Sequence, residues 1–415
     1  MSCIHVVGAG LAGLAAALRL AEARRTVVLH EASRQAGGRC RSYLDATLGC
    51  RIDNGNHLLI AGNTAAMAYL DAIGARDTLI GPDEPAYPFL DVASGERWTL
   101  RPNAGRVPWW VWSASRRVPG TSAWDYLRAL RLKCARGDAT VAAMLADDRL
   151  FRRLWQPLAV AALNTEAEAG QARLLSRVIG ESFGRGGAAC RPLVPRDGLS
   201  ESLVDPALAR LATLGAAVRF GSRLRAIEQT TARITALDFD EGRVELGPND
   251  AVVLAVTAPV AARLLPGLTV PDEFRAILNA HYKIAAPAAA PLFIGLIGGT
   301  AEWVFHKREV LSVTVSAADR LMDTSAEDLA QVLWRDVARA YDMPAEPLPP
   351  WQIVKERRAT FAATPAQVVR RPRTRTRSEN LVLAGDWTDT GLPATIEGAI
   401  RSGFAAAAAL LPQKT

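Results

Sequence analysis

The stretch IHVVGAGLAGLAAALRLAEARRTVVLHE, residues 4–31, decides the fold of this chain. Residues 4–7 form a short apolar run that suits a buried parallel strand. The three glycines that follow have the spacing GxGxxG and are Gly8, Gly10 and Gly13. Residues 11–23 contain no helix breaker, and residues 26–29 form a second apolar run. This order predicts a β-α-β unit that binds a dinucleotide, with the pyrophosphate at the helix N-terminus and Glu31 accepting the ribose hydroxyls.

A second group of glycines follows the acidic residue. Gly37, Gly38 and Arg39 come after Glu31 in the spacing ExxxxxGGR, which a nicotinamide dehydrogenase would not need. The pattern resembles that of the FAD-dependent amine oxidases and phytoene desaturases, in which the arginine approaches the pyrophosphate. The resemblance therefore favours FAD over NAD.

Composition describes a globular enzyme with more than one domain. The 415 residues exceed a single core, and the content is 49% hydrophobic and 22% charged. The net charge of +7 comes with no basic stripe interleaved with aromatic residues, so nucleic acid is not an expected partner. Five scattered cysteines without CxxC spacing indicate neither a disulfide framework nor a metal site. No cysteine follows Cys190, so we expect the flavin to be bound non-covalently.

The middle of the chain is expected to form a second domain. Residues 88–100 read as a hairpin, and residues 122–184 as helices that cover an apolar tunnel. Between them, VPWWVWS places Trp109, Trp110 and Trp112 beside arginines, which is typical of a surface that dips into a bilayer interface. Burial of these tryptophans in the core is the equal alternative. We expect a cytoplasmic protein, peripheral to the inner face of the membrane.

Five later segments complete the expected order of elements. Residues 217–227 predict a pair of strands, and residues 251–256 predict a buried strand that returns to the first sheet. Residues 272–278 are expected to be helical, as are residues 326–341. The basic stretch 370–377 is expected to be a solvated crossing between domains.

The prediction is therefore an α/β protein, with a Rossmann-type FAD-binding domain that is split in sequence. A mixed β-sheet and helices form the substrate domain. The FAD-binding domain is expected to comprise residues 1–60, 195–262 and 375–415. The substrate domain is expected to comprise residues 61–194 and 263–374, with a helical part, a candidate for facing the membrane, at about 101–190.

A last motif lies near the C-terminus, where GDWTDTGLPATIEGAIRSG occupies residues 385–403. An apolar strand at residues 381–384 precedes it, and a helix to residue 411 follows. The helix dipole is available to the pyrimidine edge of the flavin, and Asp386 would meet the ribityl and phosphate end. The stretch closely resembles the C-terminal FAD motif of the amine oxidase and desaturase family.

Three further passages resemble the squalene-associated FAD-dependent desaturases, the bacterial hydroxysqualene dehydroxylases of hopanoid synthesis. They are DNGNHLL, WQPLAVAALNT and VPRDGLSESLVDP, at residues 53–59, 155–165 and 194–206. The chain departs from the family where Asn56 replaces a usual glutamine and where NAHYKI replaces a pattern nearer NVHFWYD. The resemblance implies removal of the hydroxyl of hydroxysqualene to give squalene, with hydride from reduced FAD.

This reaction has physical requirements of its own. The hydroxyl is allylic, so its protonation and loss leave a delocalised cation that hydride can quench. The protein must supply an acid, a dry tunnel and electron-rich walls. His57, Tyr282 and His281 are the candidate acids, and Trp387 and Tyr282 are the candidate aromatic walls.

The candidate FAD contacts lie in the two end motifs, in the loop after the fingerprint and in the strand near the adenine. They are Gly8, Gly10, Leu11, Ala12, Gly13, Glu31, Ala32, Gly38, Arg39, Asn54, Gly55, Asn56, His57, Leu224, Gly385, Asp386, Ala394, Thr395 and Ile396.

The electron source and the alternatives complete the hypothesis. A second GxGxxG on a strand-to-helix turn is absent from the sequence, so the reductant is expected to be diffusing NAD(P)H or a protein donor. Contact with upstream squalene-pathway enzymes is a further expectation. The alternatives are a phytoene-type polyprenoid desaturase, an FAD-dependent amine oxidase and a non-enzymatic flavin-binding scaffold at the membrane.

Overall fold

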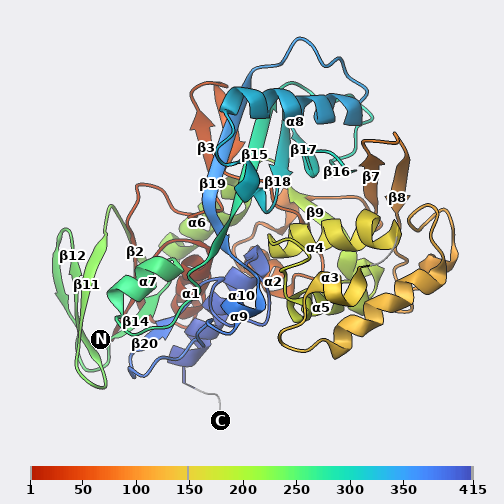
Figure 1. The fold of residues 1–415 in the computed structure, drawn as a ribbon. Helices are drawn as coiled ribbons and strands as arrows, with labels where there is room; N and C mark the ends of the chain where they lie inside the picture. The colour runs from red at the N-terminus through yellow and green to blue at the C-terminus, as the bar shows by residue number, and fades with distance from the viewer. Residues whose placement is uncertain (1, 147–148, 413–415) are drawn as a thin grey trace.

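The computed structural model describes residues 2–146 and 149–412, and its cofactor half is built on a five-stranded parallel sheet (Figure 1). The strand order is β10-β2-β1-β14-β20. The strands are β1 (Cys3–Val7), β2 (Thr26–Glu31), β10 (Ala217–Phe220), β14 (Ala251–Leu254) and β20 (Leu381–Leu383). Segments far apart in sequence therefore meet in one sheet, which confirms the predicted split domain. Its exact boundaries stay a prediction, and residues 1 and 413–415 lie outside the described residues.

Helices made of small residues cover this sheet. The fingerprint helix α1 (Leu11–Glu22) packs on the C-terminal helix α10 (Ile396–Leu410). A Cβ atom added to Gly403 would lie 2.2 Å from the carbonyl oxygen of Ala12, so glycine is what allows the close approach of the two helices. Further helices of this half are α2 (Thr64–Ala72), α6 (Asp205–Thr213) and α7 (Ala258–Leu264).

The substrate half contains a seven-stranded mixed sheet in the order β19-β15-β18-β17-β16-β7-β8. The strands are β7 (Tyr87–Asp91), β8 (Arg97–Leu100), β15 (Phe274–Lys283), β16 (Phe293–Ile297), β17 (Trp303–Lys307), β18 (Val310–Val315) and β19 (Trp351–Phe361). Helix α8 (Ala326–Ala340) lies across one face, and the strands extend from it toward α10 (Figure 1). The predicted hairpin at residues 88–100 and the predicted helix at residues 326–341 are confirmed.

One prediction about strands is wrong, and a second is confirmed only in part. Residues 274–278 are not helical, because β15 pairs with β18 and β19 on both sides and buries alternate residues against α8. Residues 217–227 do form two strands, but they do not pair with each other. Gly221, with φ +74°, separates β10 in the parallel sheet from β11 (Leu224–Gln229), which pairs with β12 (Ile234–Phe239).

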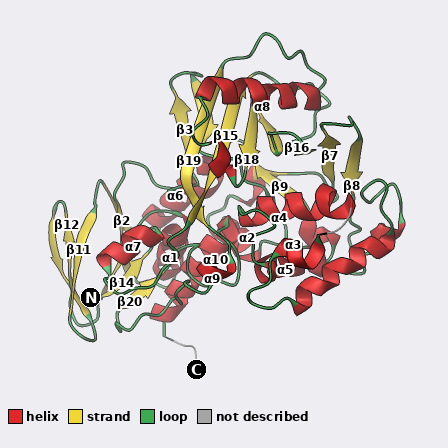
Figure 2. Cartoon of the chain, viewed as in Figure 1, coloured by secondary structure: helices red, strands yellow, loops and turns green. Residues whose placement is uncertain are grey.

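A helical subdomain lies beside the mixed sheet, as predicted for residues 122–184; residues 147–148 lie outside the described residues (Figure 2). Its α-helices are α3 (Val141–Leu145), α4 (Gln156–Leu163) and α5 (Ala172–Glu181). Tighter or wider helical turns are η2 (Trp109–Trp112), η3 (Ala123–Cys134), η4 (Phe151–Trp155), η5 (Phe183–Arg185) and η6 (Gly187–Cys190).

The remaining elements of the described residues are short. They are β3 (Ser42–Asp45), β4 (Cys50–Asp53), β5 (Leu59–Ile60), β6 (Leu79–Ile80), β9 (Pro192–Pro195), β13 (Gly242–Glu245), η1 (Arg76–Thr78), η7 (Ser200–Val204), η8 (Ala318–Leu321) and α9 (Pro365–Val368). The β3–β4 hairpin ends at Asp53, and the loop that follows it contacts the mixed sheet at Asn279.

Candidate functional site: a split flavin cradle facing an aromatic cluster

The fingerprint glycines form a backbone cradle at the N-terminus of α1. A Cβ atom on Gly13 would lie 1.8 Å from the carbonyl oxygen of Gly8, and one on Gly8 would lie 2.4 Å from that of Ala255. A Cβ atom added to Gly10 would have no described heavy atom within 4 Å. Gly8 and Gly13 are therefore required by packing, whereas Gly10 borders open space that suits a pyrophosphate.

Glu31 ends β2 beside this cradle, and backbone N–H groups fix both of its carboxylate oxygens. The N–H of Ala9 donates to Oε2 and that of Ser33 to Oε1, each at 2.8 Å. Ala32 is exposed next to it, and buried Leu224 begins the adjacent β11. Glu31 thus lies at the end of β2, the position from which an acidic residue contacts the ribose in a Rossmann-type site.

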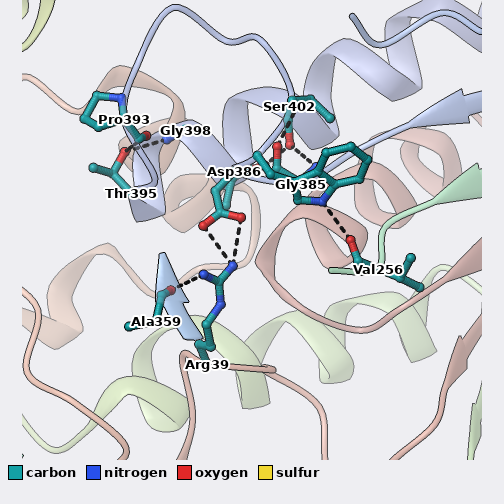
Figure 3. Close-up of polar contacts among 12 residues, drawn as sticks. Arg39, Val256, Ala359, Gly385, Asp386, Pro393, Thr395, Gly398 and Ser402 are labelled. Carbon is teal, nitrogen blue, oxygen red and sulfur yellow. Dashed lines mark hydrogen bonds and ion pairs between the residues drawn. The ribbon is translucent and has the colours of Figure 1, made fainter. Parts of the chain in front are cut away.

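Arg39 and Asp386 connect the two ends of the cofactor half (Figure 3). Nη2 of Arg39 lies 2.8 Å from both carboxylate oxygens of Asp386, and Nη1 donates to the carbonyl oxygen of Ala359. Asp386 raises the pKa of Arg39 further above its usual value. The Arg39 side chain nevertheless stays 40% accessible, so this ion pair has free space beside it for an anionic group.

The N-terminus of α10 lies in the same region. The side chain of Thr395 accepts a hydrogen bond from the N–H of Gly398 at 3.0 Å and caps the helix (Figure 3). Gly385 donates its N–H to Ser402 at 2.8 Å, which fixes the strand-to-helix turn. Ala394 and Ile396 flank the cap, and the helix dipole gives this N-terminus a partial positive charge.

The loop after β4 lies against the mixed sheet on the face opposite α8. Asn54 accepts a hydrogen bond on its carbonyl oxygen from Asn279 at 3.3 Å. Asn56 donates to Thr314 at 3.2 Å, and Thr314 donates to Asn279 at 2.8 Å. A Cβ atom on Gly55 would lie 3.1 Å from Asn279. The Oδ1 atom of Asn56 is buried without a partner among the described residues, so it is available to a ligand.

Asp53 fixes the start of this loop through a buried ion pair with Lys307. Ser42 donates to the same carboxylate at 2.6 Å, and the N–H of Leu199 donates to it at 2.9 Å. Burial alone would raise the pKa of Asp53, but these three partners outweigh it and lower the pKa. The carboxylate therefore stays charged and ties β17 to the cofactor half.

The two candidate histidines, His57 and His281, differ in their contacts but have the same protonation state. Nδ1 of His281 lies 2.8 Å from Oγ of Ser312, and its Nε2 has no partner among the described residues. His57 keeps some accessible surface. Burial lowers the pKa of each to about 4, so both rings are neutral at pH 7 and neither is a strong acid there.

Tyr282 and Trp387, the expected aromatic walls, are both buried and make other contacts. Tyr282 points to the face covered by α8, where its hydroxyl donates to the carbonyl oxygen of Ala330 at 2.7 Å and its ring packs on Trp334. Trp387 is 3% exposed and donates to the carbonyl oxygen of Val256 at 2.8 Å. The strand period of two explains why Tyr282 and His281 point in opposite directions.

An aromatic cluster that was not predicted from the sequence lines the face of the sheet opposite α8. Its members come from β7, β16 and β17 and are Tyr87, Phe89, Phe293, Trp303 and Phe305. Ring centroids are 5.6 Å apart for Phe89 and Trp303, and 6.1 Å apart for Phe293 and Phe305. The sequence does show aromatic residues at alternate positions of residues 303–305, which would place them on one face of a strand. It does not show that residues 87–89 form a strand of the same sheet, because they lie some 200 residues away.

A cavity of about 420 Å³ opens beside this cluster, between α2, β6 and β9. Ile80 and Leu193 line it. Ile80 also packs with Val194 and Leu58 against Phe293 and Phe305. The cavity thus borders the apolar cluster and not the glycine cradle.

The basic stretch at residues 370–377 is not a fully solvated linker, as Arg371 shows. Arg371 is 7% exposed, and its Nη2 donates to the carbonyl oxygens of Asp386, at 3.2 Å, and of Thr388. Its guanidinium lies over the ring of Phe361, and burial lowers its pKa to about 10. The prediction failed because the acceptors are carbonyl oxygens of the C-terminal motif, which side-chain patterns do not reveal.

The cradle, the capped α10 and the apolar cluster together define a class of protein, a two-domain flavoprotein oxidoreductase. Comparisons with known proteins agree. The family model for flavin containing amine oxidoreductase matches residues 11–287 and 298–411. The chain therefore belongs to the flavin-containing amine oxidoreductases, in the branch that holds the hydroxysqualene dehydroxylases.

Similarity to individual proteins identifies this branch of the family. The chain is 51% identical over 406 residues, 97% of both chains, to the hydroxysqualene dehydroxylase of Rhodopseudomonas palustris. It is 24% identical, over 98% of both chains, to a probable zeta-carotene desaturase of Synechococcus elongatus. The structure of putrescine oxidase bound to putrescine superimposes with a TM-score of 0.70 at 18% identity, over 98% of both chains, which shows a shared fold alone.

Proposed function

We propose that this protein removes the allylic hydroxyl of hydroxysqualene to give squalene, in squalene and hopanoid biosynthesis. The observation that carries the proposal is the 51% identity to a hydroxysqualene dehydroxylase along nearly the whole chain. A non-covalently bound FAD, in its reduced form, would supply the hydride. Gly8, Gly10 and Arg39 would hold its pyrophosphate, Glu31 its ribose, and the N-terminus of α10 its pyrimidine edge.

The residues of the mixed sheet would supply the environment for the substrate. The rings of Trp303 and Phe305 would stabilise the allylic cation by roughly 0.5–2 kcal/mol each. The free Oδ1 of Asn56 and the free Nε2 of His281 are polar atoms that would orient the hydroxyl. His57 and His281 would act here in their neutral forms, as orienting groups. Tyr282 is left out of the proposal, because its hydroxyl points to α8.

Product analysis tests this function against its alternatives. Purified protein with FAD and dithionite should convert hydroxysqualene to squalene anaerobically, with gas chromatography and mass spectrometry as the readout. The oxidised protein should neither desaturate phytoene nor oxidise putrescine. Desaturation of phytoene at a rate comparable to turnover of hydroxysqualene would instead make the protein a polyprenoid desaturase.

The external reductant would be NAD(P)H that diffuses to the flavin. The single GxGxxG on a strand-to-helix turn, at Gly8 to Gly13, supports this, because a dedicated nicotinamide site would need another. Stopped-flow mixing with NADPH should bleach the flavin at least as fast as turnover. If the flavin stays oxidised, a protein donor replaces NAD(P)H. Contact with upstream squalene-pathway enzymes stays a prediction.

Peripheral membrane contact would occur at the tryptophan patch, which comprises Val107, Trp109, Trp112, Trp124, Leu127 and Leu130. Trp109 is 52% exposed, Trp112 64% and Trp124 66%, and the guanidinium of Arg116 lies over the ring of Trp109. Exposed apolar side chains beside arginines suit an interface with anionic lipid. Trp110 does not join them, since it is 6% exposed and packs on Tyr126. No helix in residues 2–146 or 149–412 has the length and apolarity to cross a membrane.

Liposome flotation tests the patch. The triple variant W109S/W112S/W124S should lose most binding to vesicles of phosphatidylglycerol and phosphatidylcholine, and it should keep turnover of detergent-solubilised substrate. A matched control, Val369→Ser, removes an 80% exposed apolar residue outside the patch and should bind as the parent does. Undiminished flotation of the triple variant would exclude this surface.

A further inference from the structure

Arg371 is a buried cation in a stretch whose following arginines face solvent. Its side chain is 7% exposed, whereas Arg373, Arg375 and Arg377 are exposed. Its guanidinium carbon lies 4.8 Å from the ring centroid of Phe361, the last residue of β19. Burial lowers its pKa only to about 10, so the group is charged at pH 7. A full positive charge is therefore held inside the protein.

The hydrogen bonds of Arg371 go to the motif loop, residues 386–390, which lies between β20 and α10. Its Nη2 donates to the carbonyl oxygen of Asp386 at 3.2 Å and to that of Thr388. The same nitrogen lies 3.3 Å from Oγ1 of Thr390. Three positions of the motif loop are thus held by one guanidinium, and one of them is Asp386, whose carboxylate pairs with Arg39 (Figure 3).

The charge of Arg371 has no counter-ion of its own. Its acceptors are oxygen atoms of neutral groups, and its Nε and Nη1 have no hydrogen-bond partner among the described residues. The charges of Asp389 and Asp386 act on it, but Asp389 is exposed and Asp386 is paired with Arg39. A buried charge of this kind is costly, and its field extends far because the interior screens it little. Arg371, Asp386 and Arg39 together leave one net positive charge at the C-terminal motif.

The hydrogen bond from Arg371 to Asp386 also orients a peptide group. The bond between Asp386 and Trp387 is trans, so its C=O and N–H point in opposite directions. The N–H of Trp387 therefore points away from Arg371, and it has no acceptor among the described residues. A hydrogen bond on the carbonyl side polarises such a group and strengthens the bond that its N–H makes. The motif loop thus presents a polarised donor on the side away from Arg371, which suits an electron-rich atom of a bound cofactor.

We propose that Arg371 is a positioning residue for the flavin, which orients the motif loop and whose buried charge favours the reduced form of the cofactor. The inference rests on the proposed function. Reduced flavin carries a negative charge that oxidised flavin lacks, so a buried cation close to the site stabilises the reduced form more than the oxidised form. A higher potential favours electron transfer from NAD(P)H to the flavin, the step that prepares the enzyme for turnover.

Redox titration of the holoenzyme without substrate tests this role. Arg371→Gln removes the charge and keeps an amide that can donate to the same carbonyl oxygens. The affinity for reduced flavin should fall at least 10-fold more than the affinity for oxidised flavin, which lowers the midpoint potential by about 30 mV for a two-electron couple. Arg371→Lys keeps the charge, so its potential should lie near that of the parent. The shift should persist at high salt because the charge is buried.

Arg373→Gln is the matched control, because it removes the same charge from an exposed position two residues away. It should leave the potential unchanged. Titration of the apoprotein with both forms of FAD gives the same affinity ratio where binding is too weak for the redox titration.

A parental potential in Arg371→Gln would overturn the assignment. The same lowered potential in the glutamine and lysine variants would also overturn it, because a purely structural role depends on the guanidinium hydrogen bonds and not on the charge. Loss of all FAD binding from both variants would make Arg371 a residue of the fold and would overturn it as well. Failure of the parent to form squalene would contradict the proposed function instead, since the potential is measured without substrate.

Discussion

The cofactor half and the substrate half are built by different means. In the cofactor half, backbone groups and glycines form the cradle, and most of the pieces come from short contiguous motifs at the two ends of the chain. In the substrate half, side chains from β7, β15, β16, β17 and β18 converge on one face of a sheet. The cofactor site therefore depends on local backbone shape, whereas the substrate site depends on strand register.

The largest expected effect comes from adding one methyl group to the cradle. Gly13→Ala places a Cβ atom 1.8 Å from the carbonyl oxygen of Gly8, so α1 cannot keep its place and the variant should lose FAD and fold poorly. Gly10→Ala meets no described atom within 4 Å and should fold normally while binding FAD at least 10-fold more weakly. Thermal unfolding and flavin fluorescence separate the two. Equal behaviour of both variants would contradict the division between packing and cofactor glycines.

The buried ring of His281 in the substrate half should make the protein sensitive to acid. Burial lowers the pKa of His281 from 6.5 to about 4, so below pH 6.5 the unfolded chain binds a proton that the folded chain refuses. The free energy of unfolding should therefore fall as the pH drops from 6.5 to 4, by about 3 kcal/mol for this one group. Denaturant titrations across this range should show a shallower fall for His281→Asn. Parallel curves for parent and variant would mean that the buried ring is not neutral.

Arg39 lies where the two halves meet, and its loss should weaken FAD rather than the fold. Removal of the paired guanidinium by Arg39→Met should raise the Kd for FAD by roughly 10- to 100-fold, since a hydrogen bond to a charged group contributes about 1.5–3 kcal/mol. Arg76→Met removes an exposed ion pair with Asp71 and is the control. Titration of the apoprotein with FAD is the measurement, and the proposed pyrophosphate contact would be excluded by equal Kd values.

The smallest effect is expected at the aromatic cluster. Trp303→Leu keeps an apolar side chain but removes the ring face, and turnover should fall by roughly 2- to 30-fold, the equivalent of about 0.5–2 kcal/mol. The flavin spectrum and the Kd for FAD should not change. A larger loss in FAD affinity than in turnover would place Trp303 in the cofactor half after all.

The sequence predicted the cofactor half well because its signals are local. The spacing of Gly8, Gly10 and Gly13 and the C-terminal motif each specify a strand, a turn and a helix within about 30 residues. The same reasoning misjudged the segment that became β15, because a short apolar run without its partner strands can be read as helix or strand. Tyr282 and the aromatic cluster needed the face and register of each strand, and these depend on pairings between segments some 200 residues apart. Arg371 was missed because its acceptors are backbone carbonyl oxygens.

The proposed function requires the reduced cofactor half to deliver hydride to an allylic substrate held under the mixed sheet. The direct test is a single anaerobic turnover, in which photoreduced protein is mixed with hydroxysqualene while flavin absorbance and squalene are both followed. One squalene should form for each flavin reoxidised, with the same rate constant for both signals. Flavin that stays reduced while no squalene forms would contradict it.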